Sequence, residues 1–256
     1  MIPKIIHYCW FSQDELPLQA QKCIASWKKW MPDYEIRKWT LEDFDANSVV
    51  LTKEALETRK WAFLTDYVRQ YALYNCGGIY MDSDVMLYSS LCPLLDGDFV
   101  SACEYHPNKD ELQRNEINKI LDGNGKRIGS EMKVFGIGVQ AAVLASVKGH
   151  VVPRKVMDFY TKYDLAQILE KKLTAPTSIA YNMEEFGFLY KDEEQVLPEG
   201  IHLYPSRVIS NYDQKNKDSV AVHWCAGSWT RRTIVQRVKH TLNTFVLYRK
   251  IRDVLK

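Results

Sequence analysis

The spacing of apolar residues changes period several times in the N-terminal third of the chain. Residues 4–11 form a short, apolar, β-rich run that is typical of a buried strand. Between Pro17 and Pro32 apolar residues recur every three or four positions with lysines between them, which predicts an amphipathic helix. Residues 34–39 alternate with period two, as half-exposed strands do. A strand, a helix and a strand in succession favour an α/β fold.

A second helix is predicted over residues 52–75, because its apolar positions form one stripe and Gly77-Gly78 follows as a stop signal. Residues 79–81 then form a predicted core strand. The polar stretch 104–133 is interpreted as an insertion or lid with some helix. Later apolar runs predict strands at 99–103, 134–139, 201–204 and 220–224, and helices at 154–163 and 166–173.

The composition is that of an ordinary globular protein. The chain has 256 residues, enough for one large domain or two small ones, and 46% of them are hydrophobic and 26% charged. The net charge of +2 argues against a general nucleic-acid binder, so we expect no nucleic-acid partner. The charge is uneven, because residues 231–256 hold eight Lys or Arg against one Asp, about +7, and leave about −5 to the rest.

The basic C-terminal stretch 231–256 also has apolar residues near helical spacing, which predicts a basic amphipathic helix. Such a helix either lies on an anionic membrane surface or packs its apolar side on the domain and exposes a solvated basic face.

The cysteines and the N-terminus indicate a reducing compartment. The six cysteines include no Cys-x-x-Cys pair, and Met1 leads into Pro3-Lys4 instead of a secretory signal. The longest stretch without a charged residue, 134–147, is shorter than the roughly 20 residues of a spanning helix. We therefore expect a cytoplasmic protein, peripheral at the inner face of the cell membrane if the basic helix binds lipid.

The strongest candidate for chemistry is Asp82-Ser83-Asp84, which follows the predicted strand 79–81. Because a strand turns alternate side chains to one face, both carboxylates would point the same way and could hold a hard cation. The carboxyl end of a strand is also where α/β sheets bind ligands. Mg²⁺ or Mn²⁺ held there would suit a diphosphate substrate. The alternative is that a short Asp-x-Asp lies on a solvated turn by chance.

Other polar and aromatic residues have two interpretations each. Asp66 and Arg69 form either a polar clamp for sugar hydroxyls or a helical salt bridge. His223 could be a metal ligand and Trp229 a lid over a ligand, or both could be ordinary packing residues. Trp10 could stack on a base or fill the edge of a sheet.

Four segments carry a resemblance to a known family: residues 2–11, residues 32–35, Asp66 to Leu73, and Gly77 to Val85. An Asp-x-x-Arg, a Gly-Gly-Ile-Tyr and an Asp-x-Asp in this order and spacing are specific as a set. Over about the first ninety residues the chain resembles glycosyltransferase family 32, the DXD sugar-binding-motif family, and it is distantly similar to the large glucosylating toxins. Residues 223–229 resemble the closing segment of such enzymes.

The resemblance implies an α/β fold of the GT-A type, with a mixed central sheet flanked by helices. Residues 1–230 would form the catalytic domain, with a nucleotide-sugar-binding half at 1–105 and the acceptor side and closing segment at 106–230, followed by the helix 231–256. It also implies a retaining hexosyltransferase that moves a sugar from a nucleotide diphosphate donor, UDP, to a saccharide or lipid-linked saccharide acceptor. Capsule, lipopolysaccharide or another surface polysaccharide would be the product.

The resemblance further implies donor-binding roles for Tyr8, Trp10, Asp66, Arg69, Asp82, Ser228 and Trp229. Trp10 would stack on the base, and Asp66 and Arg69 would hold the sugar hydroxyls. Ser228 and Trp229 would close over the diphosphate.

It implies Mn²⁺, or Mg²⁺, as the cofactor. Asp84 would ligate the metal directly, Asp82 would contact ribose, sugar or a metal-bound water, and His223 would be a further ligand or a phosphate contact. Asp66, Arg69, Asp82 and Asp84 would be the catalytic residues. Such a metal stabilises the charge that a leaving diphosphate develops.

Two rival functions use the same residues. In a haloacid-dehalogenase-like phosphatase Asp82 would be the nucleophile and Asp84 the acid/base. That family needs its motif at the start of the fold and a later Gly-Asp-x-x-x-Asp, whereas Gly97-Asp98 is followed at that place by Ala102. The other rival is a non-catalytic sugar-nucleotide-binding protein.

Overall fold

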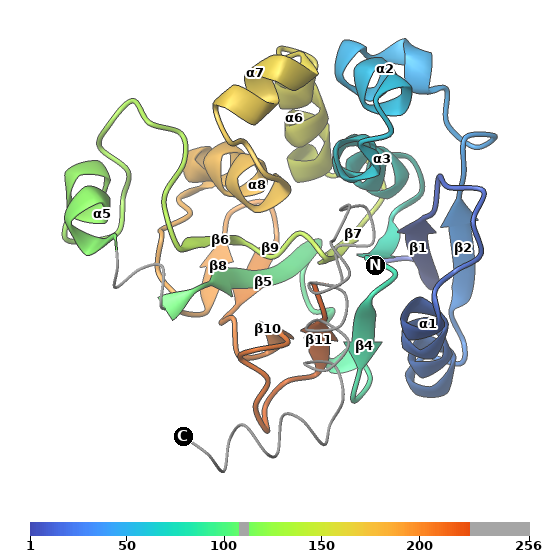
Figure 1. Cartoon of the computed structure of the whole chain (residues 1–256). Helices are drawn as coiled ribbons and strands as arrows, with labels where there is room; N and C mark the ends of the chain where they lie inside the picture. The colour runs from blue at the N-terminus through green and yellow to red at the C-terminus, as the bar shows by residue number, and fades with distance from the viewer. Residues whose placement is uncertain (108–112, 226–256) are drawn as a thin grey trace, which may run out of the picture.

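The computed structural model describes residues 1–107 and 113–225 (Figure 1). Its strands are β1 (Ile5–Cys9), β2 (Glu35–Trp39), β3 (Gly78–Met81), β4 (Val85–Leu87), β5 (Phe99–Tyr105), β6 (Ile137–Val139), β7 (Val143–Ser146), β8 (Gln195–Leu197), β9 (Ile201–Tyr204), β10 (Ile209–Asn211) and β11 (Ala221–His223). Its helices are α1 (Leu18–Trp30), α2 (Val50–Glu57), α3 (Trp61–Cys76), α5 (Arg114–Ile120), α6 (Val151–Tyr160), α7 (Leu165–Glu170) and α8 (Ala175–Met183). Short 3-10 turns lie at Ala46–Ser48, Cys92–Leu94 and Glu184–Phe186.

A mixed sheet runs through the centre of the described chain. Its strand order is β2-β1-β3-β7-β5-β9-β8, and β6 pairs with β5 beside this path. β1 is parallel to β2 and β3, and β5 is parallel to β9, whereas β7 is antiparallel to both β3 and β5. The predicted fold class, a mixed central sheet flanked by helices, is confirmed. Strands from both sides of residue 105 contribute to this sheet.

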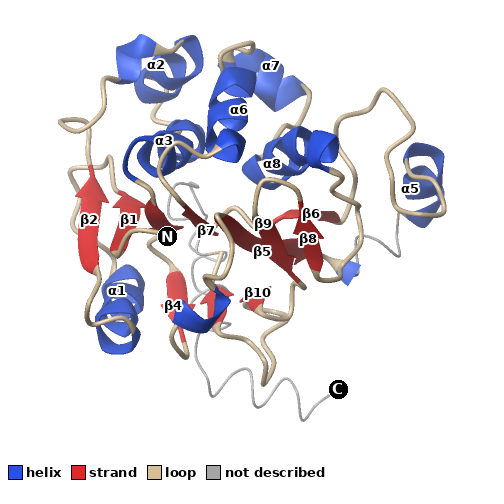
Figure 2. Cartoon of the chain, turned by 180° about the vertical axis from the view of Figure 1, so that it is seen from behind, coloured by secondary structure: helices blue, strands red, loops and turns tan. Residues whose placement is uncertain are grey.

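Helices cover both faces of the sheet. Figures 1 and 2 show α2, α3, α6, α7 and α8 over one face, and α1 with a smaller sheet over the other. The strand side chains alternate between these layers, as the pleat requires. In β3, for example, Tyr80 packs into the core under α3 and α6, whereas Ile79 and Met81 pack into the core on the α1 side.

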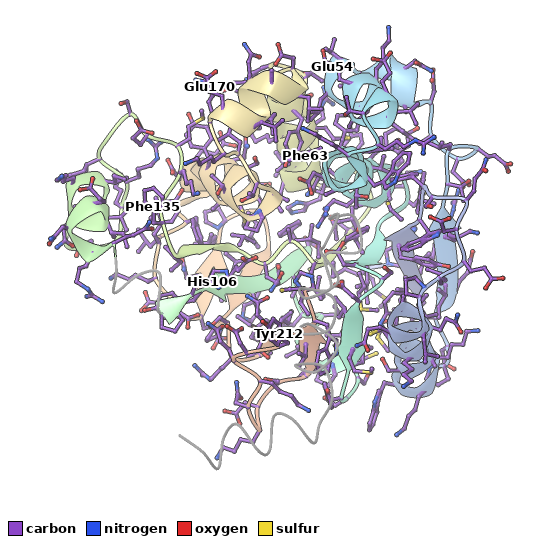
Figure 3. The ribbon with its side chains drawn as sticks, viewed as in Figure 1. Glu54, Phe63, His106, Phe135, Glu170 and Tyr212 are labelled. Carbon is purple, nitrogen blue, oxygen red and sulfur yellow. The ribbon has the colours of Figure 1, made fainter. Side chains whose placement is uncertain are left out.

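The helices over the first face are tied to one another by polar contacts as well as by the core. Glu54 of α2, labelled in Figure 3, accepts a hydrogen bond from the backbone N–H of Leu165 with its Oε2 at 2.8 Å. This bond satisfies one of the unpaired N–H groups at the start of α7.

Within the described residues, no helix is both long and apolar enough to cross a membrane.

The smaller sheet has the order β10-β11-β4 in the described chain. β11 is parallel to β10 and antiparallel to β4. α1 packs on β4, and the fully buried Trp27 donates its indole N–H to the carbonyl of Val85 at 2.7 Å. The smaller sheet therefore fixes the chain immediately after Asp84.

The single helix predicted over residues 52–75 is wrong. The structure has two helices, α2 and α3, separated by Thr58, Arg59 and Lys60, and Arg59 has a φ of 53°. The buried stripe of α2 includes Leu51 and Ala55, and one more turn would place Arg59 on it. The chain turns there instead, because burying an unpaired guanidinium is costly.

Other boundaries also differ from the sequence predictions. The first three strands and α1 form where they were predicted, and a helix, α5, lies in the insertion 104–133. The strand predicted at 134–139 is confined to β6, and the helix predicted at 154–163 begins earlier, as α6. The prediction missed β4, β7, β8, β10 and α8.

Gly77 and Gly78 turn the chain from α3 into β3. Their φ angles are 66° and 104°, in the region that favours glycine. A Cβ on Gly78 would lie 2.6 Å from the carbonyl oxygen of Ile5 and 3.1 Å from Nε2 of His7. Only glycine allows β3 to start so close to the backbone of β1.

We predict that Gly78→Ala lowers the free energy of unfolding by about 2–4 kcal/mol, because it adds backbone strain to a backbone clash. Gly123→Ala is the control, since a Cβ there meets no atom within 4 Å, and it should change stability by less than about 0.5 kcal/mol. Urea denaturation of both variants checks this. Equal stability of the two would contradict it.

A fully buried histidine joins β1 to this turn and to β2. Nε2 of His7 donates to the carbonyl of Gly77 at 2.7 Å, and Nδ1 accepts the indole N–H of Trp39 at 3.0 Å. These two bonds require the neutral imidazole with its proton on Nε2. Burial lowers the pKa of His7 below 6.5, Arg37 lowers it further, and the bond to Gly77 opposes this.

We predict that His7 makes the protein less stable in mild acid. Because the folded protein protonates His7 only at a lower pH than the unfolded chain does, lowering the pH through 6.5 favours the unfolded chain. Unfolding free energies of the wild type and of His7→Gln should be measured between pH 7.5 and pH 5. As the pH is lowered, the free energy of unfolding of the wild type should fall by up to about 1.4 kcal/mol per pH unit more than that of the variant. Parallel pH profiles would contradict this assignment.

Candidate metal and donor-binding site

The candidate site lies at the carboxyl edge of the parallel strands β1 and β3. His7 lies beside Tyr80 in their register, so Cys9 at the end of β1 lies at the level of Asp82. Trp10 follows Cys9 and continues the pairing with β2, because its backbone N–H donates to the carbonyl of Trp39. Ligands bind at this edge in α/β sheets.

Asp82 and Asp84 lie in a turn, which corrects the prediction that strand alternation brings them together. The turn is closed by a hydrogen bond from the N–H of Val85 to the carbonyl of Asp82 at 2.9 Å. β11 then runs beside β4 with His223 opposite Val85, and the N–H of Trp224 donates to the carbonyl of Asp84 at 3.1 Å. This pairing brings a side chain from the far end of the described chain to the turn.

Three side chains that could ligate a metal converge here: Asp82, Asp84 and His223. One potential ligand atom from each lies within 4.8 Å of the other two. Nε2 of His223 is 3.4 Å from Oδ1 of Asp84 and 3.9 Å from Oδ2 of Asp82. The three side chains are between 15% and 23% exposed, so a ligand can reach them from solvent. Two carboxylates and an imidazole fit a divalent cation such as Mn²⁺, which takes oxygen and nitrogen ligands.

The charge of His223 reflects these neighbours. Burial opposes its protonation, but the charge of Asp84, together with its hydrogen bond, raises the pKa of His223 well above 6.5. Its Nδ1 lies 3.5 Å from Sγ of Cys225, whose backbone has a φ of 50°. Without a cation, a protonated imidazole partly balances the two carboxylates.

Arg69 connects the aspartates to α3. Its guanidinium lies 2.9 Å from Oδ1 of Asp66 and 3.6 Å from Oδ1 of Asp82, and it donates to the carbonyl of Ala141 at 2.6 Å. It also lies over the ring of Tyr80, 4.8 Å from the ring centre. Arg69 and Asp66 are 5% and 7% exposed, so the predicted helical pair is formed, but it is buried inside the protein.

One buried guanidinium serves two carboxylates. Burial raises the pKa of Asp66 to about 6, the charge of Arg69 opposes this rise, and the charge of Asp82 adds to it. Burial alone would lower the pKa of Arg69, but the charges of Asp82 and Asp66 are among those that raise it. Arg69 therefore stays charged, and the carboxyl of Asp66 takes up a proton at a higher pH than an ordinary aspartate does.

The sequence analysis missed two groups that hold this arrangement. The hydroxyl of Tyr80 donates to Oδ1 of Asp82 at 2.6 Å, and the carbonyl of Ala141 accepts from Arg69. Side chains two residues apart on a strand share a face, so the position of Tyr80, two residues before Asp82, could have indicated this contact. A backbone carbonyl gives no signal in the sequence.

The two aromatic residues of β1 have neighbours of their own. Tyr8 is 8% exposed and packs edge-on against Trp27 in the α1-side core. Trp10 is half-buried, and its indole N–H donates to the carbonyl of Asp14 at 2.8 Å. Their donor-binding roles stay predictions. Ser228, Trp229 and the predicted helix 231–256 lie outside the described residues.

Most of the site lies in a part of the sequence that is similar to known proteins. A family described as "glycosyltransferase sugar-binding region containing DXD motif" matches residues 17–101. Over residues 17–101 the chain is therefore similar to the DXD sugar-binding region of glycosyltransferases. This sugar-binding region includes Asp66, Arg69, Asp82 and Asp84 and agrees with the family resemblance predicted from the sequence. His223 lies outside it and reaches it through β11.

One similar curated protein is inositol phosphoceramide mannosyltransferase 3 of Schizosaccharomyces pombe (strain 972 / ATCC 24843). It is 36% identical over 109 residues, which cover 37% of this chain and 27% of that protein. Two similar solved structures are the PaToxG glycosyltransferase and a galactosyltransferase, LgtC, with donor and acceptor sugar analogues. The first has 16% identity, a TM-score of 0.48 and coverage of 72% of this chain and 69% of that one. The second has 15% identity, a TM-score of 0.45 and coverage of 93% and 94%.

We predict that Arg69→Leu lowers the free energy of unfolding by about 3–5 kcal/mol, because it leaves buried carboxylates without a counter-charge. Arg69→Lys should lower the free energy of unfolding by less, because lysine keeps the positive charge and lacks only the forked guanidinium. Arg154→Leu is the control. Arg154 pairs with Asp158 at 3.1 Å, but both side chains are 56% exposed, so this change should cost under about 1 kcal/mol.

Chemical denaturation of the three variants at neutral pH checks this prediction. A loss for Arg69→Leu no larger than that for Arg154→Leu would show that Arg69 does not hold the cluster together.

Proposed function

We propose that the chain is a metal-dependent glycosyltransferase that moves a hexosyl group from a nucleotide diphosphate donor to a saccharide acceptor. The match of the sugar-binding region supports the reaction class. The observation that carries the proposal is the convergence of Asp82, Asp84 and His223 at the carboxyl edge of β3. A solvated turn bearing two aspartates by chance would not be expected to meet an imidazole from a separate strand.

The residues present suit a divalent cation, which would offset the negative charge that develops on the diphosphate as the sugar–phosphate bond breaks. Asp84 and His223 would bind it directly. Asp82 is held for this purpose, since its Oδ1 accepts the hydroxyl of Tyr80 and faces Arg69, while its Oδ2 faces His223. A preoriented carboxylate does not have to reorganise during the reaction, which is how such groups accelerate it.

Asp66 and Arg69 support the same step from α3. The bond from Arg69 to the carbonyl of Ala141 ties α3 to the segment before β7, and the bond between Asp66 and Arg69 at 2.9 Å orients the guanidinium. We propose that Asp66, near the edge where the donor sugar would lie, accepts hydrogen bonds from sugar hydroxyls, and that Arg69 acts mainly by holding both aspartates in place.

The finer parts of the proposal rest on the family resemblance. We propose UDP as the nucleotide, Mn²⁺ or Mg²⁺ as the cation and retention of configuration at the transferred sugar. The mannosyl group in the name of the Schizosaccharomyces pombe relative supports a hexose as the transferred sugar. We further propose a cytoplasmic location and a role in surface polysaccharide synthesis.

We predict that Asp84→Asn lowers donor turnover at limiting Mn²⁺ by about 10²–10³-fold, because it removes one charged ligand from the cluster. Release of labelled sugar from UDP-glucose, UDP-galactose and GDP-mannose, with and without Mn²⁺, measures this. The free energy of unfolding is measured in parallel, because Asp84 is 15% exposed and pairs with His223 at 3.4 Å, and turnover is compared where both proteins are folded.

Asp33→Asn is the matched control. Asp33 is 79% exposed and precedes β2, at the opposite edge of the parallel strands, so its loss should leave turnover unchanged. If the Asp84→Asn variant turns over donor at more than about a tenth of the wild-type rate, Asp84 is not a metal ligand. Binding of a nucleotide sugar by the wild type with no turnover of any donor would favour a non-catalytic binding protein.

A further inference from the structure

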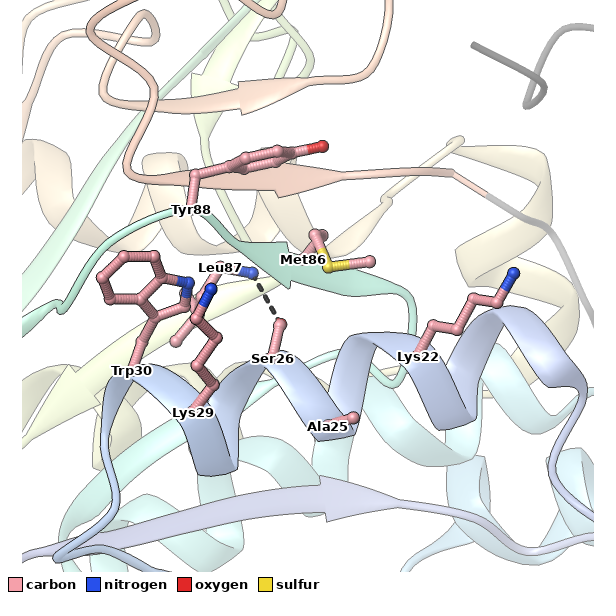
Figure 4. Close-up of a pocket in the computed structure, with 8 residues that line it drawn as sticks. All are labelled: Lys22, Ala25, Ser26, Lys29, Trp30, Met86, Leu87 and Tyr88. Atoms are coloured by element: carbon pink, nitrogen blue, oxygen red, sulfur yellow. Dashed lines mark hydrogen bonds between the residues drawn. The ribbon is translucent and has the colours of Figure 1, made fainter.

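A groove of about 380 Å³ lies between α1 and β4, on the side of the molecule that the small sheet covers (Figure 4). The groove is lined by Lys22, Ala25, Ser26, Lys29, Trp30, Met86, Leu87 and Tyr88. Figure 4 shows Trp30 and Lys29 at one end and Lys22 at the other. Its volume is within the range of small-molecule binding sites.

The charge of this groove is of one sign. The sequence of α1 contains three lysines and no acidic residue. Lys22 and Lys29 are seven residues apart, so they lie on one face of the helix about 10 Å from each other along its axis. Within residues 1–107 and 113–225, no carboxylate lines the groove and neither lysine forms an ion pair. Two unneutralised ammonium groups at this spacing attract a ligand with more than one anionic group.

The aromatic side chains add a second kind of recognition. The Nζ of Lys29 lies 4.7 Å from the ring centre of Trp30, and the Nζ of Lys215 lies 3.5 Å from that of Tyr88. Both rings are half-buried, so each keeps part of its surface in contact with solvent. A sugar ring is apolar on one face and carries hydroxyls on its edge, so it can pack against such aromatic side chains.

The groove is continuous with the candidate site. β4 begins one residue after Asp84, and Met86 and Tyr88 follow within about 13 Å of chain at the usual rise of a strand. α1 packs along β4, and its Trp27 donates a hydrogen bond to the carbonyl of Val85, the residue after Asp84, at 2.7 Å. A chain-like ligand whose end reaches the carboxylates could therefore lie along β4.

We infer that this groove binds an acidic saccharide, a chain of sugar rings bearing carboxylate or phosphate groups, whose end is presented to the aspartates as acceptor. The lining residues lie within 1–105, so this inference differs from the family resemblance, which implies an acceptor side at 106–230. The acceptor role rests on the proposed glycosyltransferase function. Sugar rings match Trp30 and Tyr88, and the anionic groups match Lys22 and Lys29.

The test uses the full chain and two probes with six sugar rings each: hexagalacturonate, which is acidic, and maltohexaose, which is neutral. Titration calorimetry at low and moderate salt should show binding of hexagalacturonate that weakens with salt. The neutral probe should bind more weakly. In Lys22→Ala/Lys29→Ala the affinity for hexagalacturonate should fall about tenfold. Lys22→Arg/Lys29→Arg should restore it, because the charges return.

Lys28→Ala is the matched control, since Lys28 is an exposed lysine of the same helix that does not line the groove. Equal affinities of the Lys22/Lys29 and Lys28 variants, or no binding of hexagalacturonate, would overturn the inference. A third result would also overturn it: the wild type binds phosphatidylserine vesicles but not hexagalacturonate, and the Lys22/Lys29 variant loses binding to the vesicles. The partner would then be a membrane. Binding of UDP with Mn²⁺ by the wild type is measured in parallel. Its absence would contradict the proposed function, whereas failure of hexagalacturonate alone contradicts only the groove.

Discussion

The buried guanidinium of Arg69 is the interaction on which the candidate site depends. It joins Asp66 on α3, Asp82 at the end of β3 and the carbonyl of Ala141 before β7. A buried arginine with two carboxylates is tolerated only when its partners are close and well oriented. The same contacts that make this charge tolerable also hold Asp82 with one oxygen engaged and the other facing His223. Fold stability and site geometry therefore share one set of contacts.

A second constraint comes from the small sheet. Asp82 and Asp84 lie in a short turn, and such a turn by itself does not fix where two side chains point. Pairing of β4 with β11 holds the turn from one side, and α1 packs on β4 from the other through the bond from Trp27 to Val85. Residues from three separate parts of the chain thus meet at one edge of the central sheet. Among the described residues, only this cluster offers three potential metal ligands.

The sequence predicted those parts that depend on local pattern. The period of apolar residues located α1, β1, β2 and β9, and the glycine pair marked the end of α3. Motif order identified Asp66, Arg69, Asp82 and Asp84 before any contact between them was known. The three-residue strands β4, β8 and β10 were missed because a run of three has no measurable period, whereas β11, which is equally short, was found from the apolar run around it.

Long-range contacts were beyond the reach of local pattern. The break at Arg59 arises because a continued helix would bury a charge, which depends on what packs on α2. The role of Tyr80 depends on the geometry of the following turn, and that of the Ala141 carbonyl leaves no mark on the side chains. His223 was predicted as a ligand at the end of a predicted strand, but the pairing of that strand with β4, which brings His223 to Asp84, became evident only in the sheet topology.

The proposed reaction requires the two aspartates and the histidine to hold a divalent cation next to the donor diphosphate. Crystals grown with Mn²⁺ and UDP can be measured by anomalous diffraction at a wavelength where manganese scatters strongly. We expect one strong peak between the carboxylates of Asp82 and Asp84 and the imidazole of His223, in contact with diphosphate oxygens. UDP bound with no manganese peak there, or manganese bound elsewhere on the protein, would contradict it.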